Sequence, residues 1–154
     1  EGQVPLYYAH KPTGRGDDYL DLTGHPLFPF GHGLSYTTFA YSDHAVDVRP
    51  ANDSVALQVS ATIRNIGAVP GDEVVQLYLH DVLGSVARPI IELAGFARVT
   101  LAPNVSQTVT FNVSHAQLSM LDANMKRVVE PGRWRILMGA SSRDIRLRRE
   151  VDLP

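Results

Sequence analysis

The sequence contains no cysteine, and this absence excludes several kinds of chemistry at once. The chain cannot form a disulfide framework, hold a metal ion through thiolates or use a cysteine nucleophile. The absence does not define a cellular compartment, because many exported proteins also lack cysteine. The fold must therefore be stabilised by a hydrophobic core.

An excess of charge and long apolar runs are also missing. The formal net charge is −2 over 154 residues, which argues against general binding to nucleic acid. No segment approaches the roughly 18 apolar residues of a membrane-spanning helix. The opening Glu1-Gly2 lacks the basic and apolar regions of a signal peptide. We expect neither a nucleic-acid nor a membrane partner, and the missing initiator Met suggests a piece of a longer protein.

The composition that remains is that of one globular domain with an unusual N-terminal segment. Hydrophobic residues make up 44% of the chain and charged residues 19%. Residues 1–36 are rich in proline and glycine and show no period, which predicts an extended, irregular arm before a domain at 37–154. The arm nevertheless carries large apolar side chains that must pack on something: Tyr19, Leu20, Leu22, Leu27, Phe28, Phe30, Leu34 and Tyr36.

Residues 37–154 repeat an alternation of apolar and polar side chains between turn signals, which is typical of half-buried β-strands. A helical turn at 115–118, capped by Ser114, is the one helix expected. The fold class is therefore all-β, an antiparallel β-sandwich. Because there is no cysteine pair and the single Trp lies late, a fibronectin type III-like sandwich is favoured over a true immunoglobulin-like domain. The expected strands are 38–48, 55–64, 73–82, 90–100, 106–113, 127–130, 133–139 and 145–151.

Candidate catalytic groups are few. The adjacent acids Asp17-Asp18 and Asp72-Glu73 follow glycines, and we expect both pairs to be solvated loop residues. There is no G-x-S-x-G nucleophile motif, and the glycines beside His32 precede no helix pattern that would bind phosphate. The histidines also lack metal-ligand spacing. We therefore predict no catalytic residue, metal or cofactor. The six histidines are His10, His25, His32, His44, His80 and His115.

Three surface motifs have competing interpretations. Arg15-Gly16-Asp17 spells an integrin-binding tripeptide, but it precedes the first strand instead of lying on a hairpin. Eight of the fourteen basic residues lie at 126–149 and could bind an anionic polymer. We favour an edge strand with Arg146 and Arg148 on its outer face, where charge prevents aggregation. N-x-S sequons, relevant only in a eukaryotic secretory pathway, begin at Asn52, Asn104 and Asn112.

The segment P-L-F-P-F-G-H-G-L-S-Y-T-T-F at 26–39 resembles the C-terminal part of bacterial glycoside hydrolase family 3 β-glucosidases. In that family a similar stretch leads into a fibronectin type III-like domain. Upstream, residues 4–15 and 19–21 are similar to the end of the second catalytic domain and its exit linker. Downstream, the resemblance continues in order through 71–79, 85–96, 121–124, 128–132 and 139–145.

This resemblance implies a non-catalytic C-terminal module of a hydrolase that acts in carbohydrate metabolism. The parent would remove terminal non-reducing β-D-glucosyl residues with retention, through an Asp nucleophile and a Glu acid/base that both lie upstream of residue 1. No position here matches either motif, so the fragment alone is expected to be inactive. The implied partners are the upstream catalytic domains, and a homodimer stays open. A periplasmic or secreted location is common among similar enzymes, with the cytoplasm as the alternative.

The arm has a physical role in this interpretation. Contacts between domains of one chain stay mobile unless the interface is large and apolar, and an aromatic-rich arm supplies such an interface. The alternative is that the arm wraps its own sandwich. Gly31 and Gly33 would let the backbone pass close to its neighbour. The residues expected to dock on the catalytic domains are Tyr7, Tyr8, Phe28, Phe30, Gly31, Gly33, Leu34 and Tyr36.

Two further functions remain as alternatives. A carbohydrate-binding module would need exposed aromatic rings in a row, and only Tyr41 and Tyr78 lie in expected strands. An adhesion module would need Arg15-Gly16-Asp17 on a protruding loop.

Overall fold

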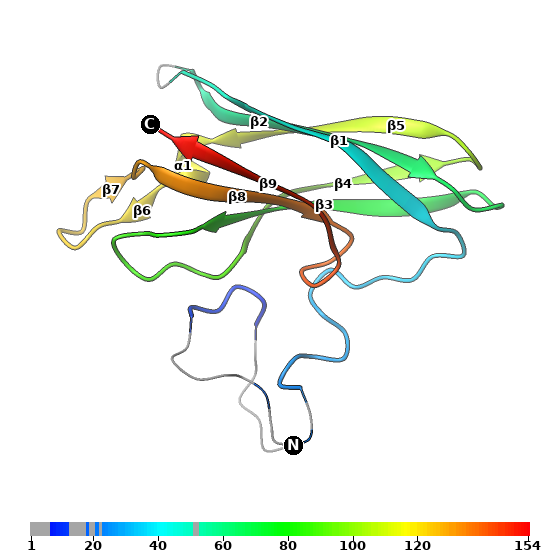
Figure 1. The fold of residues 1–154 in the computed structure, drawn as a ribbon, viewed down its shortest axis with the longest axis horizontal. Coiled ribbons are helices and arrows are strands. Elements are labelled where there is room, and N and C mark those ends of the chain that lie inside the picture. The colour runs from blue at the N-terminus through cyan, green and yellow to red at the C-terminus, as the bar shows by residue number, and fades with distance from the viewer. Residues whose placement is uncertain (1–6, 13–17, 19–20, 22, 51–52) are drawn as a thin grey trace.

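The computed structural model describes residues 7–12, 18, 21, 23–50 and 53–154, and its strands form two main antiparallel sheets. The three-stranded sheet has the order β1-β2-β5 and consists of β1 (Phe39–Val48), β2 (Val55–Asn65) and β5 (Ser106–Ser114). The four-stranded sheet has the order β4-β3-β8-β9 and consists of β3 (Gly71–Asp81), β4 (Glu92–Leu101), β8 (Gly132–Gly139) and β9 (Ile145–Leu153). Figure 1 shows the sheets as two stacked layers, which confirms the all-β sandwich.

A short connection closes one end of the sandwich. Helix α1 (His115–Leu118) begins at Ser114, whose hydroxyl accepts from the Gln117 backbone amide while the Gln117 side chain accepts from the Ser114 amide across 2.9 Å. This reciprocal capping box confirms the predicted cap. A two-stranded ribbon of β6 (Met120–Leu121) and β7 (Arg127–Val128) follows, so the expected strand at 127–130 is shorter than predicted.

The core lies between the sheets and follows from the alternation of each strand. Leu57, Val59 and Ile63 of β2 are fully buried, and they face residues of β3 and β8 that share one contiguous apolar cluster. Trp134 in β8 is 1% exposed, and the guanidinium of Arg88 lies 4.7 Å from the centre of its ring. Arg88 thereby fastens the loop between β3 and β4 to the core.

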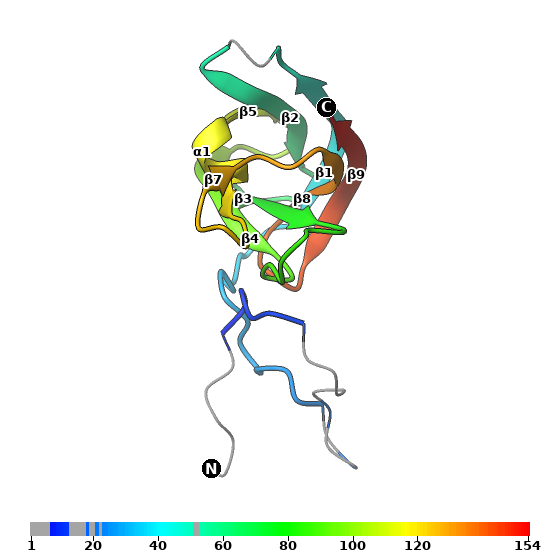
Figure 2. The same ribbon diagram turned by 90° about the vertical axis from the view of Figure 1, so that its left-hand side faces the viewer.

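The arm lies outside this core, next to one sheet. In the two perpendicular views of Figures 1 and 2, its described segments lie on the side of the four-stranded sheet and extend away from the sandwich. The three-stranded sheet forms the opposite layer. The outer face of the four-stranded sheet is therefore where the arm and the sandwich meet.

Candidate functional site

Two segments of the arm, which we call the first leg (7–12) and the second leg (23–36), are hydrogen-bonded to two loops that connect strands of this sheet. The backbone amide of Ile90 donates to the carbonyl of His10 across 2.9 Å, and that of Ser142 donates to Phe30 across 2.9 Å. The legs also contact one another, because the rings of Tyr8 and Phe30 stack with centroids 4.1 Å apart. The base of the arm is thus anchored on its own sandwich from both legs.

Gln76 and Tyr78 in β3 form a polar latch beneath the second leg. The side-chain amide of Gln76 donates to the carbonyls of Gly31 (3.1 Å) and Ala140 (2.7 Å), and its oxygen accepts from the Tyr78 hydroxyl (2.5 Å). The rings of Tyr78 and Tyr8 also pack in a T-shaped arrangement, with their centroids 6.0 Å apart. Because both latch residues alternate with the core residues Val75 and Leu77, their side chains lie on the outer face of β3. That face is nevertheless buried here, with Gln76 4% and Tyr78 0% exposed.

The two glycines of the second leg differ in their surroundings. Gly31 has a φ of +80°, and a Cβ built there would lie 2.1 Å from the side-chain oxygen of Gln76. Among the described residues, Gln76 of the latch is therefore the close neighbour of Gly31. A Cβ at Gly33 would meet no described atom within 4 Å. Gly31 permits the close approach that seats the arm, whereas Gly33 faces open space.

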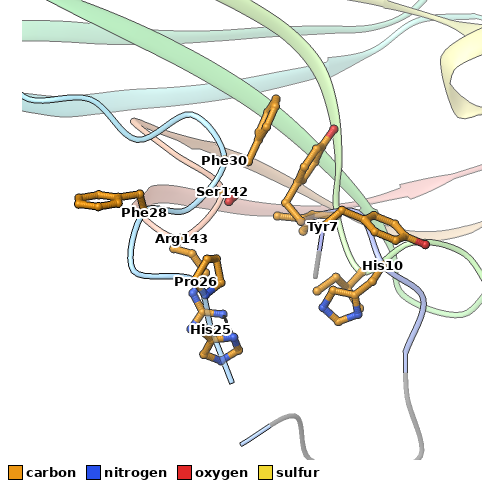
Figure 3. Close-up of a pocket in the computed structure, with 11 residues that line it drawn as sticks. Tyr7, His10, His25, Pro26, Phe28, Phe30, Ser142 and Arg143 are labelled. Carbon is orange, nitrogen blue, oxygen red and sulfur yellow. Dashed lines mark hydrogen bonds between the residues drawn. The ribbon is translucent and has the colours of Figure 1, made fainter. Parts of the chain in front are cut away.

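A hollow of about 300 Å³ separates the two legs from the sandwich. Figure 3 shows aromatic rings around it together with polar side chains from the arm and the β8–β9 turn. The Arg143 guanidinium lies 3.1 Å from Nδ1 of His25. The hollow can accept an apolar side chain or a small ring with hydrogen-bonding groups, and it is lined by Tyr7, Tyr8, His10, His25, Pro26, Phe28, Phe30, Ile90, Ile91, Ser142 and Arg143.

Most of the expected docking side chains are not covered by the sandwich. Tyr7 is 66% exposed and Phe28 69%, while Leu34 and Tyr36 are almost completely exposed. Tyr8 is half-buried by Phe30 and Tyr78. The arm therefore uses Tyr8 and one side of Phe30 to hold the sandwich and presents the other large apolar groups outward.

A small polar turn shapes the second leg where it begins. The carboxylate of Asp18 accepts hydrogen bonds from the Gly24 amide and the Thr23 hydroxyl, each 3.0 Å long. These two bonds hold the pKa of Asp18 below its ordinary value, with the Gly24 amide as the larger cause. Asp18 is exposed, as predicted, while Asp17 lies outside the described residues.

The prediction for the acid pair Asp72-Glu73 was wrong. Both residues lie within β3, where the strand has already begun, and Glu73 is 9% exposed. Asp72 accepts from the Thr100 hydroxyl at 2.6 Å and pairs with Arg98. Because a glycine precedes the pair, the sequence suggested a turn; Gly71 is instead the first residue of the strand, opposite Leu101.

Glu73 takes part in a cluster that joins the edges of the two sheets. Its carboxylate lies 3.8 Å from the Arg146 guanidinium, which also pairs with Asp144 at 2.8 Å. Burial raises the pKa of Glu73 above its ordinary value, and Arg146 opposes that effect. Burial and the Glu73 carboxylate likewise raise the pKa of Tyr41, whose ring lies 4.8 Å below the same guanidinium. Glu73 and Asp144 thus support the sandwich through Arg146, and both also line a hollow of about 530 Å³ beside the second leg.

The basic segment behaves partly as expected. β9 is an edge strand with Arg148 exposed, as predicted. Arg133 and Arg135 of the neighbouring strand β8 pair with Asp152 and Glu150 of β9. Arg146 is exposed on the same edge strand, as predicted, and the register of β8 and β9 shifts beside it. Its guanidinium turns toward β1 and donates to the carbonyl of Phe39 across 2.9 Å.

Several sequence features carry no site in the part of the chain that the structure describes. Arg15-Gly16-Asp17 lies outside the described residues, so the adhesion module stays an untested alternative. Within the described ranges, no three side chains of the His, Cys, Asp or Glu type gather as metal ligands. No helix among these residues has the length and apolarity needed to cross a membrane.

Comparison with known proteins matches both the sequence and the fold. The model of the fibronectin type III-like domain family matches residues 73–142. Thermostable beta-glucosidase B of Acetivibrio thermocellus is 46% identical over 138 residues, which cover 88% of this chain and 18% of that protein. A beta-xylosidase of Formosa agariphila is 44% identical over 147 residues, with 92% of this chain and 20% of that protein covered.

Two further proteins agree with these matches. A periplasmic beta-glucosidase of Salmonella typhimurium is 36% identical over 151 residues, with 92% of this chain and 20% of that protein covered. The solved structure of a beta-glucosidase involved in saponin metabolism from intestinal bacteria superposes with a TM-score of 0.88 and 37% identity, covering 99% of this chain and 21% of that chain. The present chain thus spans about a fifth of the length of these proteins.

Proposed function

We propose that this chain, whose residues 73–142 belong to the fibronectin type III-like domain family, is the non-catalytic C-terminal module of a glycoside hydrolase family 3 β-glucosidase. β-Glucosidases and a β-xylosidase contain a segment similar to this chain, which makes up about a fifth of their length. The parent enzyme hydrolyses terminal β-D-glucosyl residues in carbohydrate metabolism. The catalytic carboxylates belong to its other domains, and the module packs on those domains and stabilises them.

The observation that supports this role is the outward exposure of large apolar side chains on an anchored arm. A contiguous apolar patch on a soluble protein commonly marks an interaction site. Here Tyr7, Phe28, Leu34 and Tyr36 project from a segment whose base is fixed by the latch. Residues 1–36 then form the linker and the end of the preceding catalytic domain, and residues 37–154 form the module. Gly33, open on all described sides, leaves room for the partner's surface.

The anchoring explains why a module without catalytic groups can influence the enzyme. An arm that was free would lose conformational entropy when it docked. An arm already held by Tyr8, Phe30 and Gly31 presents its exposed rings in one arrangement, so less binding energy is lost to ordering. Covering one exposed Phe contributes about 1.5–3 kcal/mol.

The proposal is tested with three proteins: the parent enzyme, the parent truncated before the arm, and this chain alone. With an aryl β-glucoside as substrate, we expect turnover by the parent, no turnover by this chain, and faster thermal inactivation of the truncated protein. Phe28→Ser in the parent should also accelerate inactivation, whereas Leu121→Ser, on the distant β6 ribbon, should not. Turnover by this chain alone, or an equally stable truncated enzyme, would contradict the proposal.

Carbohydrate binding is a second candidate, because the hollow between the legs combines aromatic rings with imidazole and guanidinium groups. The strand tyrosines do not form a stacking surface, since Tyr78 is fully buried and the ring of Tyr41 is half-buried, with the Arg146 guanidinium 4.8 Å from its centre. Sugar would instead stack on Tyr7 or Phe28. Retardation of this chain in a laminarin or cellulose affinity gel, lost in Phe28→Ser, would support this function, and unchanged migration would remove it.

A periplasmic or secreted location is the compartment we propose. It is supported by the Salmonella typhimurium relative, which is named a periplasmic beta-glucosidase. Fractionation of cells that express the parent enzyme, with β-glucosidase activity measured in each fraction, tests the location. Activity confined to the cytoplasm would overturn it.

A further inference from the structure

Phe96 in the edge strand β4 is a large aromatic side chain on the outer face of the four-stranded sheet. It pairs across the strands with Gln76, the latch residue, so both side chains leave the same face of the sheet. Its neighbour Gly95 faces the other way, because a Cβ there would lie 3.0 Å from the Phe111 ring in the opposite sheet. Phe96 therefore stands beside the seat of the arm and points out of the sandwich.

The arm covers Gln76 but leaves Phe96 bare. Phe96 is 68% exposed, and Val74, two residues along β3 from Gln76 on the same face, is 39% exposed. Val74 lines a second hollow, of about 530 Å³, together with Gln76 and with Leu34 of the second leg. The exposed apolar surface of the arm thus continues through Leu34 and Val74 to Phe96.

Three polar side chains beside this surface, Asp72, Arg98 and Thr100, are paired with one another. The carboxylate of Asp72 accepts from Arg98 Nε at 3.0 Å and from the Thr100 hydroxyl at 2.6 Å. These bonds lower the pKa of Asp72, so the carboxylate stays ionised beside Arg98. Arg98 and Asp72 near Phe96 neutralise one another, so this surface favours an apolar partner surface over a strongly charged one.

We propose that Leu34, Val74 and Phe96 form a second contact surface for the catalytic part of the same polypeptide. This inference rests on the proposed function and extends the interface from the arm to the sandwich itself. The tether decides between that partner and a second copy of the chain. The arm brings the preceding domain to an effective concentration in the millimolar range, far above the concentration of other copies at working dilution. The apolar surface that continues from the arm is therefore covered by the preceding domain of the same polypeptide.

The lack of cysteine in this chain permits a direct test. Phe28→Cys, Phe96→Cys and the control Leu121→Cys are introduced singly into the parent enzyme and into the present chain. Thiol labelling is followed at each introduced position by peptide mass spectrometry. Folding is verified by Trp134 emission in the chain alone and by turnover of the aryl β-glucoside in the parent. We expect the thiol of Phe96→Cys to react about tenfold or more slowly in the parent than in the chain alone, because it is reached only when the interface opens.

The outcomes separate this inference from the proposed function. Protection of Phe28→Cys without protection of Phe96→Cys overturns the second contact surface and leaves the docking of the arm in place. Equal labelling of both variants in parent and chain overturns both. Protection of Phe96→Cys that disappears on dilution, or that also occurs in the chain alone, identifies a second copy as the partner and overturns the inference. Leu121→Cys should label rapidly in both proteins.

Discussion

The side-chain amide of Gln76 donates a hydrogen bond to the backbone carbonyl of Gly31, 45 residues earlier in the chain, across 3.1 Å. This contact joins an irregular segment to the middle of a β-strand. It makes the arm part of the folded unit, because Gln76 also bonds Ala140 and Tyr78. A side chain on the outer face of a sheet thus determines how the exposed rings are presented.

Replacing Gln76 with Leu should loosen the arm without unfolding the sandwich. The variant leaves the carbonyls of Gly31 and Ala140 and the Tyr78 hydroxyl without this partner, at a cost of about 1–3 kcal/mol for each group that stays buried and unpaired. Hydrogen exchange at Ser142, whose amide donates to Phe30, should accelerate. Gln58→Leu, on the outer face of the other sheet, is the control and should leave this exchange unchanged.

Gly31→Ala should loosen the arm as well, and Gly33→Ala should not. At Gly31 the positive φ and the approach of Gln76 to 2.1 Å from a new Cβ both oppose a side chain, whereas at Gly33 the added methyl meets open space. The expected cost at Gly31 is about 1–3 kcal/mol. Limited proteolysis of the arm in the two variants measures the difference. Equal cleavage rates would show that the close approach at Gly31 does not control the arm.

Arg88→Met should destabilise the sandwich strongly. Arg88 and its partner Asp81 are 10% and 5% exposed, so the variant leaves a buried carboxylate with its cation removed, at a cost of about 3–5 kcal/mol. The matched variant Arg98→Met breaks an exposed pair and should leave the urea midpoint almost unchanged. Urea unfolding followed by Trp134 emission measures both changes. Similar midpoints for the two variants would contradict the role of the buried pair.

Glu73 should make the free energy of unfolding depend on pH. Burial raises its folded-state pKa above the ordinary value of 4.5, so the folded protein holds this proton more tightly than the unfolded chain. The resulting stabilisation is present below about pH 4.5 and is lost as the pH rises through the folded-state pKa. Relative to the neutral variant Glu73→Gln, the wild-type protein should therefore lose stability as the pH rises from the acidic range toward neutrality.

Urea unfolding of both proteins across that range tests this prediction. A relative gain in wild-type stability with rising pH would contradict it, and would show that the ion pair with Arg146 outweighs the burial of Glu73. Asp144→Asn serves as a comparison, because Asp144 is exposed and bonds the same guanidinium.

Local patterns in the sequence determined the sandwich and its family resemblance. Alternation along residues 55–64 predicted which side chains of β2 face the core, because a strand places every second residue on one side. Ser114 predicted the start of α1 from local hydrogen bonding alone. The ordered motifs from 26–39 to 139–145 indicated the family, and the comparisons confirmed it. Each of these inferences depends on residues that are close in sequence.

Only the tertiary structure decided what covers each outer face. Alternation with Val75 and Leu77 puts Gln76 on the polar side of its strand, but it does not reveal that the arm buries Gln76 and leaves Phe96 of the neighbouring strand exposed. Glu73 of β3 and Arg146 of β9 are 73 residues apart in the sequence, and they meet only because the four-stranded sheet brings their strands together, a proximity without a local signature. Burial is a property of the neighbours that folding brings from elsewhere in the chain, so the docking surface emerges only when arm and sheet are assembled.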